Sequence, residues 1–278
     1  MIFHNPQLQS DFERRGYVVV DGLLDAAALH HLRTVWRRQE GGVGQMAYSI
    51  TAMSADGEYR RAVHAGVLAG LAAPLATIVR DYRILVGLFI NKARGGAEGA
   101  VNLHQDWSMI DESAGARSLG VWAPLTEVHP LNGCLYVVPG SQHLHPWPRA
   151  QRGAWQPLDR DQILPILEEY LVPMVLQPGQ ALIFTHRLYH GSGPNLADSE
   201  RPVAAASLIP HGAAPQVYRE RIRDGQEQLE IQEAGIDFLL DYHEFSPLPE
   251  GPVLGHVPFV RPRLEERWIR ETLRAAAG

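Results

Sequence analysis

The chain has 278 residues, of which 45% are hydrophobic and 20% are charged, a balance that is typical of a folded protein and too apolar for a disordered one. The net charge of −6 gives no electrostatic reason to expect nucleic acid or an anionic membrane as a partner, and the single cysteine, Cys134, excludes disulfides within the chain and clusters of thiolate metal ligands. No stretch approaches the roughly 20 apolar residues that span a bilayer, and the first residues lack a signal-peptide pattern, so we expect a cytoplasmic protein whose partner is a small molecule.

The first third of the chain predicts helices with one short strand between them. Residues 6–40 predict a helix, a strand and a second helix, because Gly16 stops the first helix, "YVVVDG" is β-branched, and an aspartate caps "DAAALHHLRTVWRRQ". Residues 64–82 are helical in composition, and we expect Pro74 to break or kink that helix.

From Arg83 onward the pattern changes to short apolar or alternating runs. Glycine, proline and asparagine punctuate these runs, most clearly in "LNG", "VPGS" and "QPGQ". Many short strands separated by turns are typical of an antiparallel sandwich or a small barrel. Residues 159–171 interrupt them with a helical pattern, and "RPRLEERWIRETLRAAA" predicts a closing helix.

No internal repeat, low-complexity segment or long linker divides the chain, so we expect one domain over residues 1–278. Its fold class should be mainly β with flanking helices. We expect helical N-terminal support over about 1–82, a β core over about 83–212, and a C-terminal extension over about 213–278. Nothing in the sequence indicates an oligomeric state.

The stretch "NLHQDWSMID" places a histidine and an aspartate two residues apart, His104 and Asp106. If residues 101–108 form a strand, both side chains project from the same face and can bind adjacent positions on one metal ion. Two histidines and one carboxylate on one face of an octahedron leave three positions open, as in non-haem Fe(II) oxygenases. The second histidine would come from "LIFTHRLYHGSGPN", which offers His186 and His190.

Four motifs follow one another in the order "HQDW", "GVWAPLTEVHPLNGCLYVVPGSQHLH", "QPGQALIFTHRLYHGSGPN" and "RPVAAASL". Through these motifs, the stretch from about Gly87 to Ile209 resembles the phytanoyl-CoA dioxygenase family of 2-oxoglutarate-dependent oxygenases. The opening "GYVVVDGLLD" matches more loosely, and the tail does not match usefully. The resemblance implies a double-stranded β-helix (jelly-roll, cupin-like) core, Fe(II) as the metal, and 2-oxoglutarate and O2 as cosubstrates.

The resemblance also implies roles for individual residues. It places the metal on His104, Asp106 and His190, because the "HGS" motif favours His190 over His186. Arg201 falls where the family's arginine binds the distal carboxylate of 2-oxoglutarate, a role that suits a planar guanidinium with two parallel donors. Ser192 matches a serine that helps to hold the same carboxylate. Gln105 and Trp122 match positions that line the cosubstrate pocket. Apart from the resemblance, Asn91 or Lys92, on the strand before the His-x-Asp pair, could also reach the cosubstrate.

Asp106 bears on the type of reaction, because halogenating relatives lack this carboxylate. Its presence favours hydroxylation or another oxidation, in which oxidative decarboxylation of 2-oxoglutarate to succinate and CO2 drives attack on an unactivated C–H bond. Trp107 and Phe89 are candidates for the substrate cavity. The loops expected to determine the substrate are 43–62, 94–101, 108–117 and 143–160, together with the C-terminal tail.

Two other classes of protein remain open. A metal-dependent cupin isomerase or epimerase would keep the three ligands but would have no use for Arg201 and Ser192. A non-catalytic jelly-roll binding protein would tolerate loss of the ligands, yet none is missing.

His143 and His145 also have ligand-like spacing, but no matching glutamate and histidine accompany them, which favours an ordinary loop. The acidic balance of charge disfavours a CoA thioester as substrate.

Overall fold

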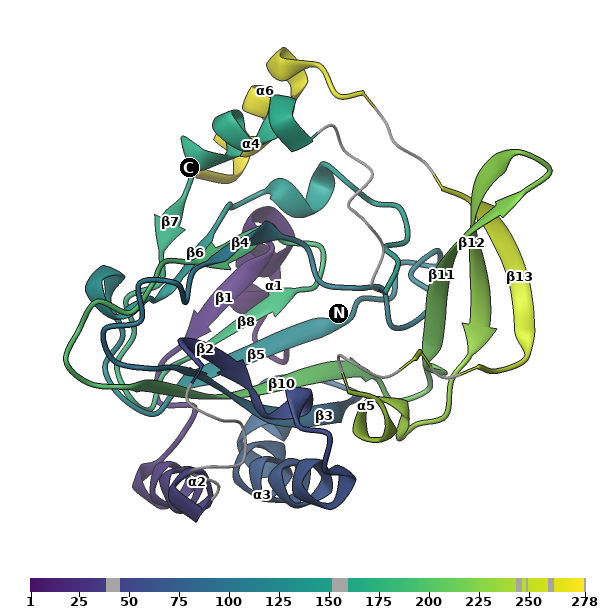
Figure 1. Cartoon of the computed structure of the whole chain (residues 1–278). Helices are drawn as coiled ribbons and strands as arrows, with labels where there is room; N and C mark the ends of the chain where they lie inside the picture. Colours follow the sequence, from purple (N-terminus) through teal and green to yellow (C-terminus); the bar gives the residue numbers. More distant parts are fainter. Residues whose placement is uncertain (39–45, 152–159, 244–246, 249, 260–262, 278) are drawn as a thin grey trace.

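Two antiparallel sheets form the centre of the molecule (Figure 1). The larger has the order β1 (Tyr17–Val20), β8 (Ala181–Thr185), β5 (Leu119–Pro124), β10 (Arg201–Pro210), β3 (Tyr82–Lys92) and β2 (Tyr48–Ile50). The smaller has the order β4 (Val101–His104), β9 (His190–Ser192), β6 (Leu135–Val137) and β7 (Val172–Pro173). The computed structural model describes residues 1–38, 46–151, 160–243, 247–248, 250–259 and 263–277.

The two sheets share a core, because alternate residues of each strand point to opposite faces. On β8, Leu182 and Phe184 face the smaller sheet, where they join Leu135 and Val137 of β6 in one buried cluster. The alternate residue Ile183 belongs instead to the cluster on the opposite face. Two antiparallel sheets packed in this way form the jelly-roll arrangement that the sequence predicts.

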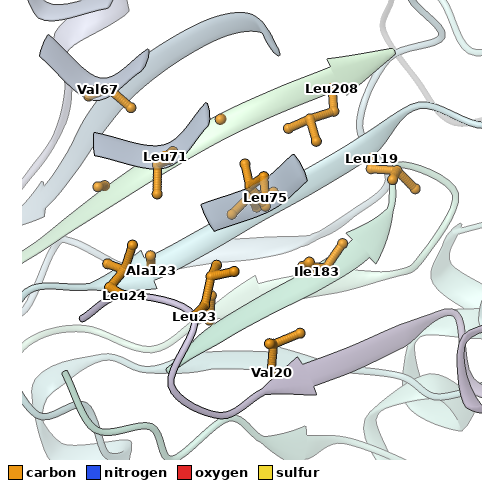
Figure 2. Close-up of a cluster of buried hydrophobic side chains, with 14 of the residues drawn as sticks. Val20, Leu23, Leu24, Val67, Leu71, Leu75, Leu119, Ala123, Ile183 and Leu208 are labelled. Atoms are coloured by element: carbon orange, nitrogen blue, oxygen red, sulfur yellow. The ribbon is translucent and has the colours of Figure 1, made fainter. Parts of the chain in front are cut away.

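Helices cover the outer face of the larger sheet. Helices α1 (Pro6–Arg15), α2 (Ala26–Arg38) and α3 (Gly57–Ala76) all contribute to this second cluster. Figure 2 shows Val67, Leu71 and Leu75 of α3 above the sheet, spaced four residues apart so that they share one helix face. Burial of each such side chain contributes about 1.5–3 kcal/mol to folding.

Helix α3 begins seven residues before the expected start at His64. The side chain of Asp56 caps it by accepting hydrogen bonds from the backbone N–H groups of Glu58 and Tyr59. The helix ends at Ala76, two residues after Pro74, as expected for a proline near a helix end. The N-terminal segment, which we expected to be helical support, also supplies the edge strands β1 and β2 and the short helix η1 (Thr51–Met53).

The C-terminal extension holds a third antiparallel sheet that the sequence analysis did not predict. It consists of β11 (Gln216–Arg223), β12 (Gln226–Glu233) and β13 (Val253–Pro258). Strands β11 and β12 are rich in glutamate, glutamine and arginine, so they lack the regular alternation of apolar residues that marks a half-buried strand. The turn between β11 and β12 holds Asp224 and Gly225, both at positive φ, and an Asp-Gly pair of this kind is the hairpin signal that was missed.

Shorter elements complete the chain. They are η2 (Pro130–Asn132), η3 (Ser141–His143), α4 (Arg160–Glu168), α5 (Phe238–Asp241) and α6 (Glu266–Ala277). Helix α4 lies in the predicted 159–171 insert, and α6 is the predicted closing helix. Among the helices that the structure describes, none is long and apolar enough to cross a membrane.

Candidate metal centre

His104 and His190 lie side by side on two adjacent strands of the smaller sheet. His104 is the last residue of β4, His190 is the first residue of β9, and the two are register partners in this antiparallel pair. Their ring centroids lie 4.3 Å apart. Gly191, next to His190, must be small, because a Cβ there would lie 2.7 Å from the carbonyl oxygen of Val101 on β4. Close approach of the two strands therefore brings the two imidazoles together.

Asp106 reaches the same point by a different route from the one expected. The expected strand over 101–108 is wrong, since β4 ends at His104 and Asp106 lies beyond it in irregular backbone. The backbone N–H of Asp106 donates to the carbonyl oxygen of His186, 3.0 Å away. This hydrogen bond, rather than the pleat of a strand, directs the carboxylate toward the two histidines.

The three side chains form a compact donor set. One ligand atom from each of His104, Asp106 and His190 lies within 4.8 Å of the others, and no other such group is found in the described part of the chain. Oδ1 of Asp106 is 3.7 Å from Nε2 of His104 and 3.9 Å from Nε2 of His190. Two nitrogens and one carboxylate oxygen suit a first-row transition metal that does not require thiolate.

Both histidines are held in the same tautomer. Nδ1 of His104 donates to the carbonyl oxygen of Asn102 at 2.9 Å, and Nδ1 of His190 donates to that of Leu188 at 3.0 Å. A carbonyl oxygen only accepts, so the proton is on Nδ1 and the lone pair of Nε2 is left for a metal ion. In each case the acceptor lies two residues before the histidine, so the backbone itself orients both rings.

The charges also fit a cation. Burial, with the neighbouring His104, lowers the pKa of His190 to about 4, so its ring is neutral near pH 7, as metal binding requires. Burial by itself would raise the pKa of Asp106, but His190, His186 and His104 lower it below its usual range, and the carboxylate stays ionised.

His186 lies on the other side of the carboxylate. Its Nε2 is 3.9 Å from Oδ2 of Asp106, whereas the donor set gathers around Oδ1. It is buried and belongs to the turn between β8 and β9, four residues before His190. The geometry therefore groups His190, and not His186, with His104 and Asp106.

Arg201 opens β10 in the wall of the same cavity and is only 1% exposed. Its Nε and Nη1 have no hydrogen-bond partner among the described residues, and its Cζ lies 5.2 Å above the ring of Trp122. Burial lowers the pKa of Arg201 to about 10, which leaves it charged near pH 7. A buried cation without an anionic partner is costly, so this end of the cavity suits a carboxylate. Ser192 of β9 lines the cavity beside it.

Lys92 and Asn91, the two alternatives on β3, point to opposite faces. Lys92 is the register partner of Arg201 and is fully buried, with Nζ donating to the carbonyl oxygen of Gly193. Burial and the nearby Arg201 lower the pKa of Lys92 to about 7. Asn91 instead donates from Nδ2 to Glu200, 3.2 Å away. Of the two, only Lys92 lies near the arginine.

Two expected site residues do not line the cavity. Gln105 lies outside the lining, and its Nε2 donates to the carbonyl oxygen of Arg187. Phe89 is fully buried on the outer face of the larger sheet, where its ring centroid lies 5.5 Å from that of Trp36. The neighbouring residues Leu88 and Ile90 face the cavity, so alternation along β3 excludes Phe89.

The cavity has a volume of about 390 Å³ and holds the donor set, Arg201, Trp122 and Trp107 in its wall. Segments 43–62, 94–101 and 108–117 each contribute to the lining, as expected of substrate loops. Segment 143–160 contributes no described residue, and its residues 152–159 lie outside the described part of the chain. The tail contributes Leu239 and Tyr242 near α5, and neither was singled out from the sequence.

A buried ionic cluster of Glu112, Arg149 and Arg187 contacts the segment that carries Asp106. Oε2 of Glu112 lies 3.2 Å from Nη1 of Arg149 and 2.9 Å from Nε of Arg187. Nε of Arg149 also donates to the carbonyl oxygen of Asp106 at 2.6 Å. The cluster thus ties the segment after β4 to the segment before β9. No spacing pattern in the sequence connects residues 112, 149 and 187, so this cluster could not be predicted from the sequence.

Comparison with known proteins agrees with this geometry. The family model described as phytanoyl-CoA dioxygenase (PhyH) matches residues 12–203. The dioxygenase trt7 of Aspergillus terreus is 34% identical over 93 residues, which are 34% of this chain and 27% of that protein. Phytanoyl-CoA dioxygenase domain-containing protein 1 of Danio rerio is 26% identical over 151 residues, 52% of this chain and 50% of that protein. The chain therefore spans half or less of the length of these relatives.

Solved structures show the same fold. The epimerase SnoN in complex with Fe3+, alpha ketoglutarate and nogalamycin RO is 24% identical, with a TM-score of 0.56 over 90% of this chain and 95% of that chain. HygX from Streptomyces hygroscopicus with nickel and 2-oxoglutarate is 16% identical, with a TM-score of 0.55 over 75% of this chain and 88% of that chain. These likenesses confirm the predicted jelly-roll core. Because the family model matches more than half of its length, the chain belongs to the phytanoyl-CoA dioxygenase family of Fe/2-oxoglutarate oxygenases.

Proposed function

We propose that this chain is an Fe(II)- and 2-oxoglutarate-dependent oxygenase that hydroxylates an unactivated C–H bond of a small molecule, with release of succinate and CO2. The observation that carries the proposal is the buried guanidinium of Arg201, which has unpartnered donors and lines the same cavity as the three-residue donor set. 2-Oxoglutarate has a keto-acid end that can bind iron and a second carboxylate at its far end. The three ligands would hold the iron for the first, and Arg201 provides a positive charge for the second.

His104, Asp106 and His190 would hold the iron. They supply three donors from one side, which leaves the other positions for cosubstrate and O2. Bound iron supplies the activation of O2 that no protein side chain can perform. The work of the chain is to present both Nε2 atoms as neutral lone pairs and to keep the carboxylate of Asp106 ionised.

Arg201 would bind the distal carboxylate of 2-oxoglutarate through two parallel N–H donors. Trp122 lies against the guanidinium and fixes its plane, and the hydroxyl of Ser192 is a further donor in the same cavity. Because Arg201 is buried, water does not screen this ion pair, and the pairing is stronger than it would be at the surface.

The other two classes of protein are less well supported. A cupin that does not use 2-oxoglutarate would leave the charge of Arg201 buried for no purpose, and a pure binding protein would not need a complete donor set. Enzymes of this fold include the epimerase SnoN and the carbocyclase SnoK, both alpha ketoglutarate dependent, so the oxidation can end in other products. Asp106 supports hydroxylation over halogenation, because it fills the position that chloride would need.

We also propose that residues 1–278 act as one domain. Ile269 and Leu273 of α6 share a buried cluster with Val138 and Leu144 from the segment that follows β6. Helix α6 is thus buried against the segment that follows β6 of the jelly roll, and such packing supports a single folding unit.

Binding of 2-oxoglutarate tests the proposal at Arg201. In the Zn(II)-loaded chain, Arg201→Ala should weaken 2-oxoglutarate binding by at least about tenfold, since loss of a charged hydrogen bond costs about 1.5–3 kcal/mol. Calorimetric titration measures the change, and Arg223→Ala, which removes an exposed arginine of β11, is the matched control. Equal affinity in the two variants would remove Arg201 from the site and the 2-oxoglutarate role with it.

A further inference from the structure

We infer that the substrate bound in this cavity is an uncharged, largely hydrocarbon molecule, an inference that rests on the proposed function. The part of the cavity away from the metal and Arg201 is called the substrate wall here. Strand β3 provides its centre with Val86, Leu88 and Ile90. A bulge at Leu85 resets the alternation, so the residues before it, such as Ile84, pack on the helical side instead.

The floor of the cavity is hollow because the middle strand of the sheet carries small residues there. Ala205 of β10 lies between Leu88 and Trp122, its register partners on β3 and β5. Two residues further along, Ser207 lies between Val86 and Gly120 in the same way. A Cβ on Gly120 would lie 2.5 Å from the ring of Phe184, so that glycine makes room for a large aromatic side wall.

Apolar side chains also close the cavity from its other sides. Strand β2 and η1 contribute Ile50, Ala52 and Met53, and β2 is paired with β3 at the edge of the sheet (Figure 1). From the C-terminal extension, Leu239 of α5 and the nearby Tyr242 line the cavity, and α5 contacts β3. Trp107 meets Tyr242 edge to face, with ring centroids 6.2 Å apart. The substrate would therefore contact hydrocarbon and aromatic rings on most of its surface.

Charge is confined to the end that the proposed function already uses. The titratable nitrogen and carboxylate groups in the lining are those of His104, Asp106, His186, His190 and Arg201. The described residues of the substrate wall include no lysine, arginine, aspartate or glutamate, and their hydroxyl groups come only from Ser207 and Tyr242. Tyr48 lies instead at the Arg201 end, because it pairs with Lys92, the register partner of Arg201. Burial of a charged group without a partner is strongly unfavourable. A phosphate, a CoA nucleotide or a zwitterionic amino acid would find no counter-charge among the described residues of the substrate wall.

The volume narrows the substrate further. About 390 Å³ is near the lower end of the roughly 300–1,000 Å³ range of small-molecule sites, and 2-oxoglutarate takes part of it. The space that remains fits a compact ring system or a short hydrocarbon chain. Such a molecule is recognised by its shape and its apolar surface, so binding should be insensitive to salt and sensitive to wall volume.

A matched pair of fluorescent probes tests this inference. N-phenylnaphthylamine is neutral, and anilinonaphthalene sulfonate has nearly the same rings with one added negative charge. The full chain is titrated with each probe in the presence of Zn(II) and 2-oxoglutarate. Zn(II) does not support turnover and does not absorb visible light. We expect saturable binding of the neutral probe and at least about tenfold weaker binding of the sulfonate. Saturating 2-oxoglutarate occupies Arg201, and the described residues of the substrate wall provide no other cation to pair with the sulfonate.

Variants of the substrate wall locate the probe. Leu88→Glu should weaken binding of the neutral probe by at least about tenfold, whereas the volume-conserving Leu88→Met should stay within about twofold. Ser207→Leu fills the hollow floor without adding charge and should also weaken binding, so the test survives if Leu88→Glu fails to fold. Thermal unfolding by circular dichroism checks that each variant is folded.

The possible outcomes separate this inference from the proposed function. Sulfonate binding as tight as neutral-probe binding, absence of neutral-probe binding, or neutral-probe binding unaffected by both Leu88→Glu and Ser207→Leu would each overturn the apolar assignment. None of these results depends on iron or on turnover. Failure of 2-oxoglutarate to bind in the calorimetric titration would instead overturn the proposed function, even with the probe bound at the substrate wall.

Discussion

A single backbone hydrogen bond orients each of the two histidine rings, His104 and His190, for metal binding. Each ring is fixed by one hydrogen bond to a carbonyl oxygen two residues earlier in its own segment, and each presents Nε2 to Oδ1 of Asp106. The backbone of two strands therefore selects the tautomer without help from another side chain. Fixed tautomers reduce the reorganisation that metal binding requires.

Removal of one ligand should abolish iron-dependent activity. His104→Ala leaves two of the three donors, and we expect loss of Fe(II) binding in the micromolar range and of 2-oxoglutarate consumption. Anaerobic Fe(II) titration and assay of succinate measure the two effects. His143→Ala is the matched control, because His143 lies in η3 outside the cavity. Undiminished 2-oxoglutarate consumption by His104→Ala would show that this histidine is not a ligand.

The structure brings together the three residues that the sequence motif proposed as metal ligands. The family's spacing pointed to His190 rather than His186, and the geometry groups the same three side chains. Gln105 and Phe89 lie outside the cavity lining. For Phe89 of β3 the reason is that a one-residue step reverses the direction of a side chain in a strand. Only the bulge at Leu85 and the pairing of β3 fix which residues face the cavity.

At the scale of elements, α3 shows how a helix packs closely on the larger sheet. Its apolar residues at intervals of four cover the larger sheet, and Gly87 of β3 permits the approach, since a Cβ there would lie 2.8 Å from Val67. The helical pattern was recognised in the sequence, but its start was placed seven residues late. The cap at Asp56 and the polar strands β11 and β12 of the third sheet lack the apolar periodicity on which such predictions depend.

Leu71 tests the packing of α3. It is fully buried, so Leu71→Ala should reduce the free energy of unfolding by about 2–5 kcal/mol, through lost apolar contact and the cavity left behind. Leu68→Ala on the same helix is the matched control, because Leu68 is 36% exposed and should lose much less. Urea unfolding followed by circular dichroism measures both. Equal losses would mean that α3 does not pack as described.

At the scale of the whole molecule, the buried cluster of Glu112, Arg149 and Arg187 links parts that are far apart in sequence. It joins the segment that carries Asp106 to the turn before His190, and Gln151 extends it to β11 by donating to the carbonyl oxygen of Gln216, 3.3 Å away. Sequence alone did not indicate this link, because each residue reads as an ordinary surface charge. Its stability should depend on pH.

Burial by itself would raise the pKa of Glu112, but Arg149 and Arg187 lower it from its ordinary 4.5 to about 2. Because the pKa is lower in the folded state, this stabilisation is complete above about pH 4.5 and is lost as the pH falls toward about 2. A shift of this size is worth about 3 kcal/mol. Urea unfolding at about pH 6 and about pH 3 should show the loss in the wild-type chain.

Glu112→Gln should be less stable than the wild-type chain near neutral pH and should lose less further stability on acidification. The exposed pair of Glu169 and Arg270 provides the control, because Glu169→Gln removes an ion pair that water already screens. Equal pH dependence in wild-type and Glu112→Gln would show that Glu112 does not couple folding to pH.

The most direct test of the central claim needs no substrate. Fe(II) and then 2-oxoglutarate are added anaerobically to the metal-free chain, and the visible absorption spectrum is recorded. The account predicts a saturable metal-to-ligand charge-transfer band, because His104, Asp106 and His190 leave open positions and Arg201 holds the far carboxylate. A chain that binds Fe(II) but develops no such band with 2-oxoglutarate would contradict it.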